Sequence, residues 1–354
     1  MHKLARIVGL AAGALLFTFP GVSDASHWPS AYDHWQMDEG NFWLLHTVED
    51  KSEHRVDFVE VTESGYYGGG WYSSHVDGLL IGDDTPVWDH VNSLAMWTHD
   101  GERWSTLFDF GAAIGESWPL RVDACDAYTV TRAPGFTVDA PAGLFSDPQQ
   151  FSLAHTPDAN VKCAGEPVQT VSFAREVGVV HLDRPSSTSA LMFARVAGEV
   201  VAQAPGETRE DDAGVSYTLM LVDDALQQPP PIQCLVAPCP ARAATLRFAV
   251  MIENTSGAAV ELPWLSTQRV ELDLFDDEGV NVASWSDDRL FGQGGYVQSL
   301  QPGERVVFFR ELPLVNTKDG PARGQPLVGE FEVVAFPVVS APKLWTLLSV
   351  APPY

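Results

Sequence analysis

Two short clusters contain residue types that could perform catalysis. Gly115-Glu116-Ser117 places a serine after a glycine, but a nucleophile elbow needs Gly-x-Ser-x-Gly on a turn from a strand into a helix. Ser74, His75 and Asp77 supply the residue types of a catalytic triad. Adjacent residues of a strand point to opposite faces, so Ser74 and His75 cannot meet if this segment is a strand. Neither cluster predicts a catalytic site.

Motifs for metals, phosphates and nucleotides are missing from the sequence. It contains no His-Glu-x-x-His, no phosphate-binding glycine loop and no dinucleotide fingerprint. All ten histidines occur at or before His181, so the chain after it offers no histidine base or ligand. The paired carboxylates of a glycosidase come from distant positions, and nothing in this acidic chain singles out one pair. We therefore expect a protein without enzymatic activity and without a cofactor.

The four cysteines indicate disulfides. Cys125, Cys163, Cys234 and Cys239 allow three pairings, and the sequence alone does not select one. A zinc site would need further cysteine or histidine ligands at short spacing, and no histidine follows position 181. Disulfides also fit an exported protein, because oxidising compartments favour them. We favour a Cys125–Cys163 bond within an N-terminal domain and a Cys234–Cys239 bond that clamps a local loop.

The first 25 residues have the features of an export signal. A basic start is followed by the apolar run Ile7–Phe19 and by small residues that end at Ala25. The run is 13 residues long, and a helix that crosses a bilayer needs about 20. We expect a bacterial protein that is secreted or periplasmic, with residues 1–25 cleaved near Ala25 and without membrane insertion.

The charge of the chain limits its partners. It has 21 basic and 47 acidic side chains, a formal net charge of −26. Removal of residues 1–25 takes away two basic residues and one acidic residue, which gives 19 − 46 = −27. Nucleic acid and anionic membrane surfaces repel such a protein. The acidity is typical of solubility and does not itself indicate a chemistry.

Strand patterns dominate the chain. From Asn41 to about residue 198, short apolar runs alternate with turn residues, and no longer stretch has clean helical periodicity. Residues 202–214 are polar and acidic, which is typical of a linker or an exposed turn. Apolar side chains then alternate over Leu246–Ile252, as in a strand with one buried face. We expect an all-β protein with two β-rich domains, residues 26–201 and 215–354.

Aromatic residues are concentrated near the start of the chain. Eight of the eleven tryptophans lie between residues 28 and 118. Core packing is the default for aromatic side chains in β proteins. Together with Tyr66, Tyr67 and Tyr72, however, these tryptophans could form a stacking surface for sugars or peptides. This gives an alternative function, an extracellular module that binds carbohydrate or another surface, for which Trp71 and Tyr72 are the test positions.

Residues 227–242 are expected to form an irregular loop. Three consecutive prolines, Pro229–Pro231, favour an extended backbone, and the cysteines at 234 and 239 bracket four residues. A stiff loop loses little conformational entropy when it binds a partner. We therefore interpret Pro231, Leu235, Val236 and Pro238 as candidate partner-binding residues. The alternative is that the clamp only stabilises a long loop.

The order of features in the C-terminal half resembles a known family. The residues that carry the resemblance are Asn254, Ser266–Glu271, Phe275-Asp276, Gly279, Val282, Trp285-Ser286, Phe291, Gln293, Leu300 and Pro302-Gly303-Glu304. Their order and spacing are similar to those of BsuPI, a family of intracellular proteinase inhibitors, over roughly Val215–Phe336. The resemblance implies an immunoglobulin-like β-sandwich that inhibits a serine proteinase or binds another extracellular protein.

Two further expectations concern aromatic residues. Large aromatic side chains dominate β cores, so we expect Trp264, Trp285 and Phe291 inside the sandwich. The N-terminal half resembles exported bacterial β-rich modules of unknown role. The resemblance rests on three short motifs, Gly40–Trp43, Leu107–Phe110 and Gly115–Trp118.

Overall fold

The computed structural model describes residues 30–50, 53–80, 85–90, 93–99, 102–157, 163, 166–230, 243–287, 289–337 and 341–353. Over these residues the chain consists of strands, turns and one 3₁₀ helix, η1 (Ala31–Asp33), which confirms the all-β prediction. None of the helices in the described ranges is long and apolar enough to cross a membrane. The expected export signal, residues 1–25, lies outside the described residues.

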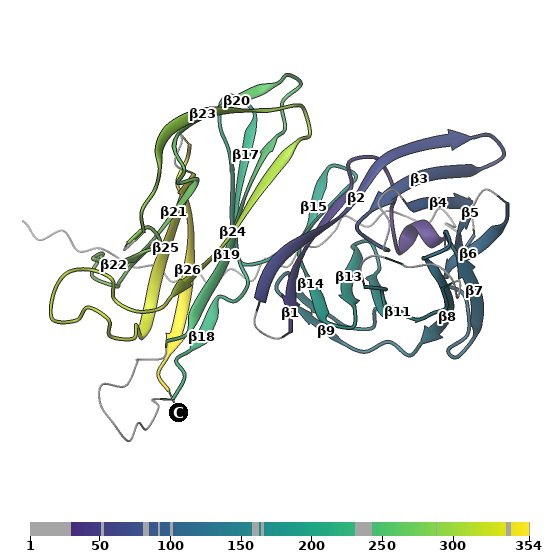
Figure 1. Cartoon of the computed structure of the whole chain (residues 1–354), viewed down its shortest axis with the longest axis horizontal. Coiled ribbons are helices and arrows are strands. Elements are labelled where there is room, and N and C mark those ends of the chain that lie inside the picture. Colours follow the sequence, from purple (N-terminus) through teal and green to yellow (C-terminus); the bar gives the residue numbers. More distant parts are fainter. Residues whose placement is uncertain are drawn as a thin grey trace, which may run out of the picture.

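Thirteen strands of the N-terminal half form one antiparallel sheet that curls around a core (Figure 1). Its path is β6-β5-β4-β3-β2-β1-β14-β13-β12-β11-β8-β7, with β15 paired to β14. The two ends of the path approach each other, because the indole N–H of Trp118 on β7 donates to the carbonyl oxygen of Thr106 on β6 at 2.9 Å. The strands are β1 (Phe42–Glu49), β2 (Glu53–Tyr67), β3 (Trp71–Asp77), β4 (Thr85–His90), β5 (Ala95–His99), β6 (Trp104–Asp109), β7 (Ser117–Arg121), β8 (Ala127–Ala133), β11 (Gln149–His155), β12 (Thr170–Ala174), β13 (Gly178–Asp183), β14 (Ser187–Val196) and β15 (Glu199–Gln203); β9 (Val138–Ala140) and β10 (Gly143–Phe145) form a separate hairpin.

Alternating side chains of this sheet point inward and form the first core. Trp43 and Leu45 of β1 contribute to it, as do residues of the other strands. The segment before β1 closes the core from one side, because Trp35 is fully buried and its ring centroid lies 5.2 Å from that of Phe173. The core therefore depends on residues that precede the sheet.

The C-terminal half is a β-sandwich, in agreement with the predicted fold class. Two sheets, in the orders β16-β17-β19-β24 and β18-β26-β25-β21-β22, enclose a second core, and β20 pairs with β23. Trp264 and Trp285 are buried in this core and Phe291 packs against it, as expected. The strands are β16 (Gly206–Glu210), β17 (Val215–Leu221), β18 (Ala225–Gln227), β19 (Thr245–Asn254), β20 (Val260–Ser266), β21 (Val270–Phe275), β22 (Asn281–Ser284), β23 (Gln293–Leu300), β24 (Arg305–Pro313), β25 (Gly329–Pro337) and β26 (Leu344–Ala351).

Residues 202–214, for which the composition predicts a linker or an exposed turn, contain strand instead. β15 ends at Gln203 on the first sheet, and β16 begins at Gly206 on the first sheet of the sandwich. Both strands are largely exposed, because they lie at sheet edges and use their backbone groups for pairing. β16 is polar, whereas β15 exposes the consecutive apolar residues Val200 and Val201. Their side chains therefore carry no apolar alternation that would identify a strand.

A third apolar cluster, called the junction cluster here, joins the two halves. One face of β17, β19 and β24 points into the sandwich core, and the other face packs on β1, β2 and β14 of the first sheet (Figure 1). This double burial explains why every residue of β17 is buried. The buried members of the junction cluster are Phe42, Leu44, Met192, Phe193, Ala204, Met220, Val222, Ala249 and Met251.

Buried ion pairs cross the same junction. Glu253 of β19 pairs with Arg195 of β14 and lies 3.8 Å from the guanidinium of Arg305. Arg305 of β24 also pairs with Glu60 of β2 at 3.0 Å, and its guanidinium lies 3.8 Å from the ring centroid of Phe42. The two halves thus share both apolar contacts and paired charges.

Candidate functional site

The disulfide prediction is confirmed where the structure describes it. Cys125 and Cys163 are bonded, with their Cα atoms 5.4 Å apart. Cys234 and Cys239 lie outside the described residues, as do the candidate partner-binding residues Pro231, Leu235, Val236 and Pro238. The described residues around this segment nevertheless show how its two ends are held.

Gln228 connects the two ends of the segment 229–243. The side chain is buried, and its carbonyl oxygen accepts a hydrogen bond from the backbone N–H of Ala244 at 2.8 Å. The amide group of Gln228 donates to the carbonyl oxygens of Leu314 (3.2 Å) and Leu327 (2.7 Å). One amide side chain therefore satisfies three backbone groups and fixes the distance between residues 228 and 244. No pattern in the sequence indicates this role, because Leu314 and Leu327 are far from Gln228 in the chain.

The clusters with catalytic residue types do not form a catalytic site. Ser74 lies opposite the core residue Val87, and its hydroxyl donates to the carbonyl oxygen of Met37 at 2.7 Å. His75, as the next residue of β3, points to the other face. Ser117 lies within β7, where its hydroxyl is 2.8 Å from that of Thr131. The sequence expectation for these two clusters agrees with their geometry.

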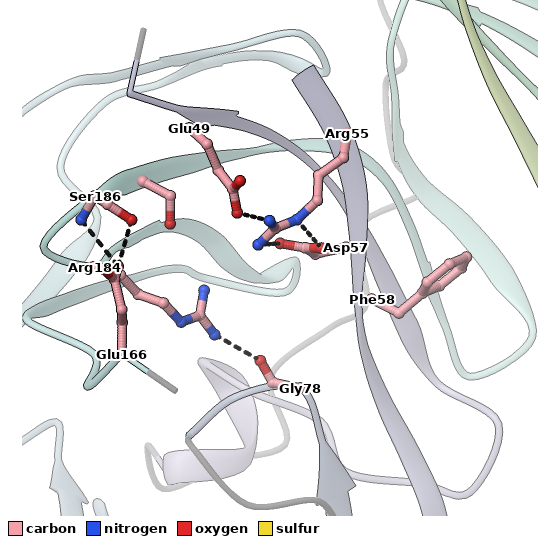
Figure 2. A pocket seen from close by; sticks show the side chains of 9 residues that line it. Glu49, Arg55, Asp57, Phe58, Gly78, Glu166, Arg184 and Ser186 are labelled. Atoms are coloured by element: carbon pink, nitrogen blue, oxygen red, sulfur yellow. Dashed lines mark hydrogen bonds and ion pairs between the residues drawn. The ribbon is translucent and has the colours of Figure 1, made fainter. Parts of the chain in front are cut away.

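A charged hollow of about 420 Å³ opens between the turns at one end of the first sheet (Figure 2). Arg55 of β2 pairs with Glu49 of β1 and with Asp57, whose carboxylate lies 2.8 Å from the Arg55 Nε. On the opposite wall, Ser186 donates from its backbone N–H (3.0 Å) and its hydroxyl (2.6 Å) to Glu166. The hollow is thus built from segments that are distant in the sequence, and no sequence pattern predicts it.

Arg184 and Gly78 close the floor of this hollow. A guanidinium nitrogen of Arg184 lies 3.4 Å from the carbonyl oxygen of Gly78. Gly78 has φ +79°, and a Cβ at this position would lie 1.9 Å from the carbonyl oxygen of Phe58. Only glycine therefore permits this close approach of residue 78 to the backbone of Phe58 on β2.

The carboxylates of the hollow all accept hydrogen bonds or pair with a cation. Hydrogen bonds from Ser186 lower the pKa of Glu166 below its usual value. Glu49 and Asp57 both pair with Arg55. A general acid needs a raised pKa, so Glu166 does not suit that role, and the ion pairs around Arg55 suit polar recognition.

Two groups of tryptophans in the described part of the N-terminal half differ in burial, and Trp118 packs against the first core without being fully buried. Trp35 and Trp43 are fully buried in the first core, as the default interpretation predicts. Trp71, Trp88 and Trp97 are only partly buried and Trp104 is exposed, and none of these four belongs to that core. Their side chains contact one another on the solvent side of the sheet. These four tryptophans thus form an aromatic cluster, but Tyr66 and Tyr72, which were predicted to join it, pair with each other and point to the opposite face of β2 and β3.

Residues 240–341 match the family model BsuPI, intracellular proteinase inhibitor. The match confirms the resemblance for this part of the chain, and an inhibitor family points to a non-catalytic role for it. The matched range begins after Pro238, so the candidate partner-binding residues precede it.

The remaining comparisons are distant. No curated protein matches the chain. A β-glucosidase from Erythrobacter marinus is 18% identical over 44% of this chain and 18% of its own, with a TM-score of 0.24. A polysaccharide lyase is 11% identical over 89% of this chain and 40% of its own, with a TM-score of 0.18. This chain spans less than half of either structure, and likenesses this weak bear on neither fold nor function.

Proposed function

We propose that this chain is an exported, non-enzymatic protein that inhibits a serine proteinase through its C-terminal β-sandwich. The observation that carries the proposal is the match of residues 240–341 to an inhibitor family, on a segment that supplies strands to both sheets of the sandwich. The basic and apolar start of the sequence supports export, so the target would be an extracellular or periplasmic proteinase.

The segment 229–243 is the proposed contact with the proteinase, through Pro231, Leu235, Val236 and Pro238. Its ends are fixed by the buried side chain of Gln228, which bonds to Ala244 and to two further backbone groups. Fixed ends reduce the conformational entropy that the segment would lose on binding. The three prolines act in the same direction, because they restrict the backbone before binding.

A titration of the mature chain, residues 26–354, into subtilisin-like and trypsin-like proteinases tests the proposal. The full mature chain is needed, because the sandwich alone would expose the junction cluster to water. We expect stoichiometric loss of proteolytic activity against at least one of the two classes, and an intact chain after the incubation. No inhibition of either class at micromolar excess would contradict the inhibitor function and would leave the fold unaffected.

Two variants separate the loop from the rest of the sandwich. Leu235→Asp combined with Val236→Asp should abolish the inhibition, because charged side chains would enter the proposed contact. Val297→Asp is the matched control, because Val297 is 57% exposed on β23 of the same domain. Equal inhibition by both variants would mean that another surface of the sandwich binds the proteinase.

A further inference from the structure

An aromatic face covers the outer side of five neighbouring strands in the N-terminal half. It consists of Tyr67 on β2, Trp71 on β3, Trp88 on β4, Trp97 on β5 and Trp104 on β6. We infer that this aromatic face binds an extended, neutral polysaccharide chain by stacking of its sugar rings. The site is separate from the sandwich proposed to bind a proteinase.

Strand pairing places all five rings on one face of the sheet. Tyr67 pairs with Trp71, and Trp71 pairs with His90, which is two residues from Trp88 on β4. Trp88 pairs with Trp97, and His99, two residues further along β5, pairs with Trp104. Since paired residues and residues two apart share a face, the rings lie together. The residues between them, such as Val87 and Met96, point into the first core.

The rings form one connected surface rather than five separate side chains. Ring centroids lie 5.1 Å apart for Tyr67 and Trp88, 5.4 Å for Trp88 and Trp104, and 5.4 Å for Trp71 and Trp97. Trp71 and Trp104, at 5.8 Å, link the two groups. His90 lies against Trp71 at 4.8 Å and its Nε2 is 3.1 Å from the carbonyl oxygen of Gly69. These contacts hold the rings in place before any ligand arrives, which lowers the entropic cost of binding.

Two rings of the aromatic face are largely exposed to solvent. Trp104 is 54% exposed and Tyr67 is 56% exposed. Soluble proteins rarely leave contiguous apolar patches in water unless the patches bind something. In Figure 1, β4, β5 and β6 lie at the end of the first domain that is remote from the sandwich. The second domain therefore does not cover this face.

The chemistry of the face and the charge of the chain favour a neutral polysaccharide. The C–H face of a sugar ring packs on an aromatic ring, while its hydroxyls bond to polar groups at the rim of such a surface. Nucleic acid also stacks on aromatic rings, and membranes also bind Trp-rich surfaces. The formal charge of −26 disfavours both nucleic acid and anionic membranes as partners.

The dimensions of the face fit a chain rather than a single sugar. Five strands spaced about 4.8 Å apart span roughly 19 Å, which accommodates several sugar units. The ring planes are inclined to one another, by 51° for Tyr67 and Trp88 and by 59° for Trp71 and Trp97. Inclined rings follow a twisted soluble chain and would not lie flat on a crystalline surface.

Electrophoresis of the mature chain in gels that contain neutral polysaccharides tests this inference. The panel is hydroxyethylcellulose, xylan, glucomannan and soluble starch. We expect retardation by at least one of them, with Trp104→Ala and Trp71→Ala each weakening the affinity by about tenfold or more, the effect of losing one stacked ring. Trp345→Ala is the matched control, because Trp345 is 39% exposed but lies on β26 of the sandwich.

Three outcomes would overturn the inference. One is that none of the four polysaccharides retards the chain. Another is that Trp345→Ala weakens retardation as much as Trp104→Ala does. The third is a dimer in sedimentation velocity that Trp104→Ala dissociates, because a second copy of the chain would then cover the face. Proteinase inhibition by Trp104→Ala should equal that of the unchanged chain, so failure of either proposal is visible independently.

Discussion

His46 on β1 lies where the two halves of the chain meet, and it makes the stability of the fold depend on pH. Its ring stacks on that of Phe309 of the sandwich at 5.7 Å, and its Nε2 lies 3.0 Å from the Nδ1 of His54. Burial, with smaller effects from the charges of His54 and Arg247, lowers the pKa of His46 to about 4. The folded protein therefore keeps this imidazole neutral at mildly acidic pH.

Acidification should weaken the fold through His46. In the unfolded chain the imidazole has a pKa of about 6.5, so it binds a proton between pH 6.5 and 4 that the folded chain does not bind. The stabilisation by neutral His46 is complete above pH 6.5 and is lost as the pH falls toward 4, by up to about 3 kcal/mol. We expect His46→Phe to reduce the decrease in free energy of unfolding between pH 7 and pH 4.5, measured in urea.

Asp89 has the opposite effect on stability to His46 in an overlapping pH range, so the effect of His46 has to be measured as a difference between two proteins. Burial raises the pKa of Asp89 to about 6. The folded chain therefore holds a proton on this carboxyl that the unfolded chain releases, and Asp89 lowers stability as the pH rises from about 4 to 6. The test is thus the difference between His46→Phe and the unchanged chain at each pH. A difference that stays constant from pH 7 to pH 4.5 would contradict the role of His46.

At the scale of elements, β18 and the segment after it depend on Gln228. Gln228→Ala would leave the Ala244 N–H and the carbonyl oxygen of Leu327 without their partner, while the carbonyl oxygen of Leu314 would keep the N–H of Leu327 at 2.9 Å. A buried backbone group that loses its hydrogen bond costs about 1–3 kcal/mol, so we expect a loss of about 2–4 kcal/mol in the free energy of unfolding. Proteinase inhibition should weaken as well, because the ends of the proposed contact segment would no longer be fixed.

Gln228→Glu provides the control for this prediction. A glutamate of the same shape keeps the bond from Ala244 but cannot donate to Leu314 and Leu327. We expect it to be at least as destabilising as alanine at pH 7, because an ionised carboxylate would face two carbonyl oxygens. The free energy of unfolding of both variants is measured in urea. A glutamate variant as stable as the unchanged chain would contradict the assigned hydrogen bonds.

The elements also show which parts of the fold a single sequence reveals. The alternation of Leu246, Phe248, Val250 and Ile252 predicted a strand with a buried face, and these residues form part of β19 and of the sandwich core. β16 was missed, because an edge strand pairs through its backbone and needs no apolar alternation. That the opposite face of β19 is also buried does not follow from local sequence, because a second domain covers it.

The same distinction holds for the candidate sites. The Cys125–Cys163 bond followed from the number of cysteines and the preference for a bond within one domain. The charged hollow around Arg184 did not, because its walls come from distant segments. The aromatic face lies between these cases. Trp88 with His90 and Trp97 with His99 show the two-residue spacing of one strand face, but only the pairing of the strands brings Tyr67 and Trp104 beside them.

At the scale of the whole molecule, the junction cluster makes the two halves of the chain depend on each other. Met251 and Ala249 of β19 are buried against Phe42 and Phe193 of the first sheet. Glu253 pairs with Arg195 across the same boundary. An interface this apolar resembles a core more than a contact between mobile domains. We therefore expect the unchanged chain to unfold in a single cooperative transition.

Met251→Lys should uncouple the two domains. The substitution buries an ammonium group in the junction cluster, where the desolvation penalty is several kcal/mol, while the inner face of β19 keeps its packing in the sandwich core. We expect calorimetry to show two transitions, with the first at a lower temperature than for the unchanged chain. Val297→Lys adds the same charge at an exposed position of β23 and should leave one transition. A single unshifted transition for Met251→Lys would contradict the coupling, and the two sites proposed here would then sit on independently stable domains.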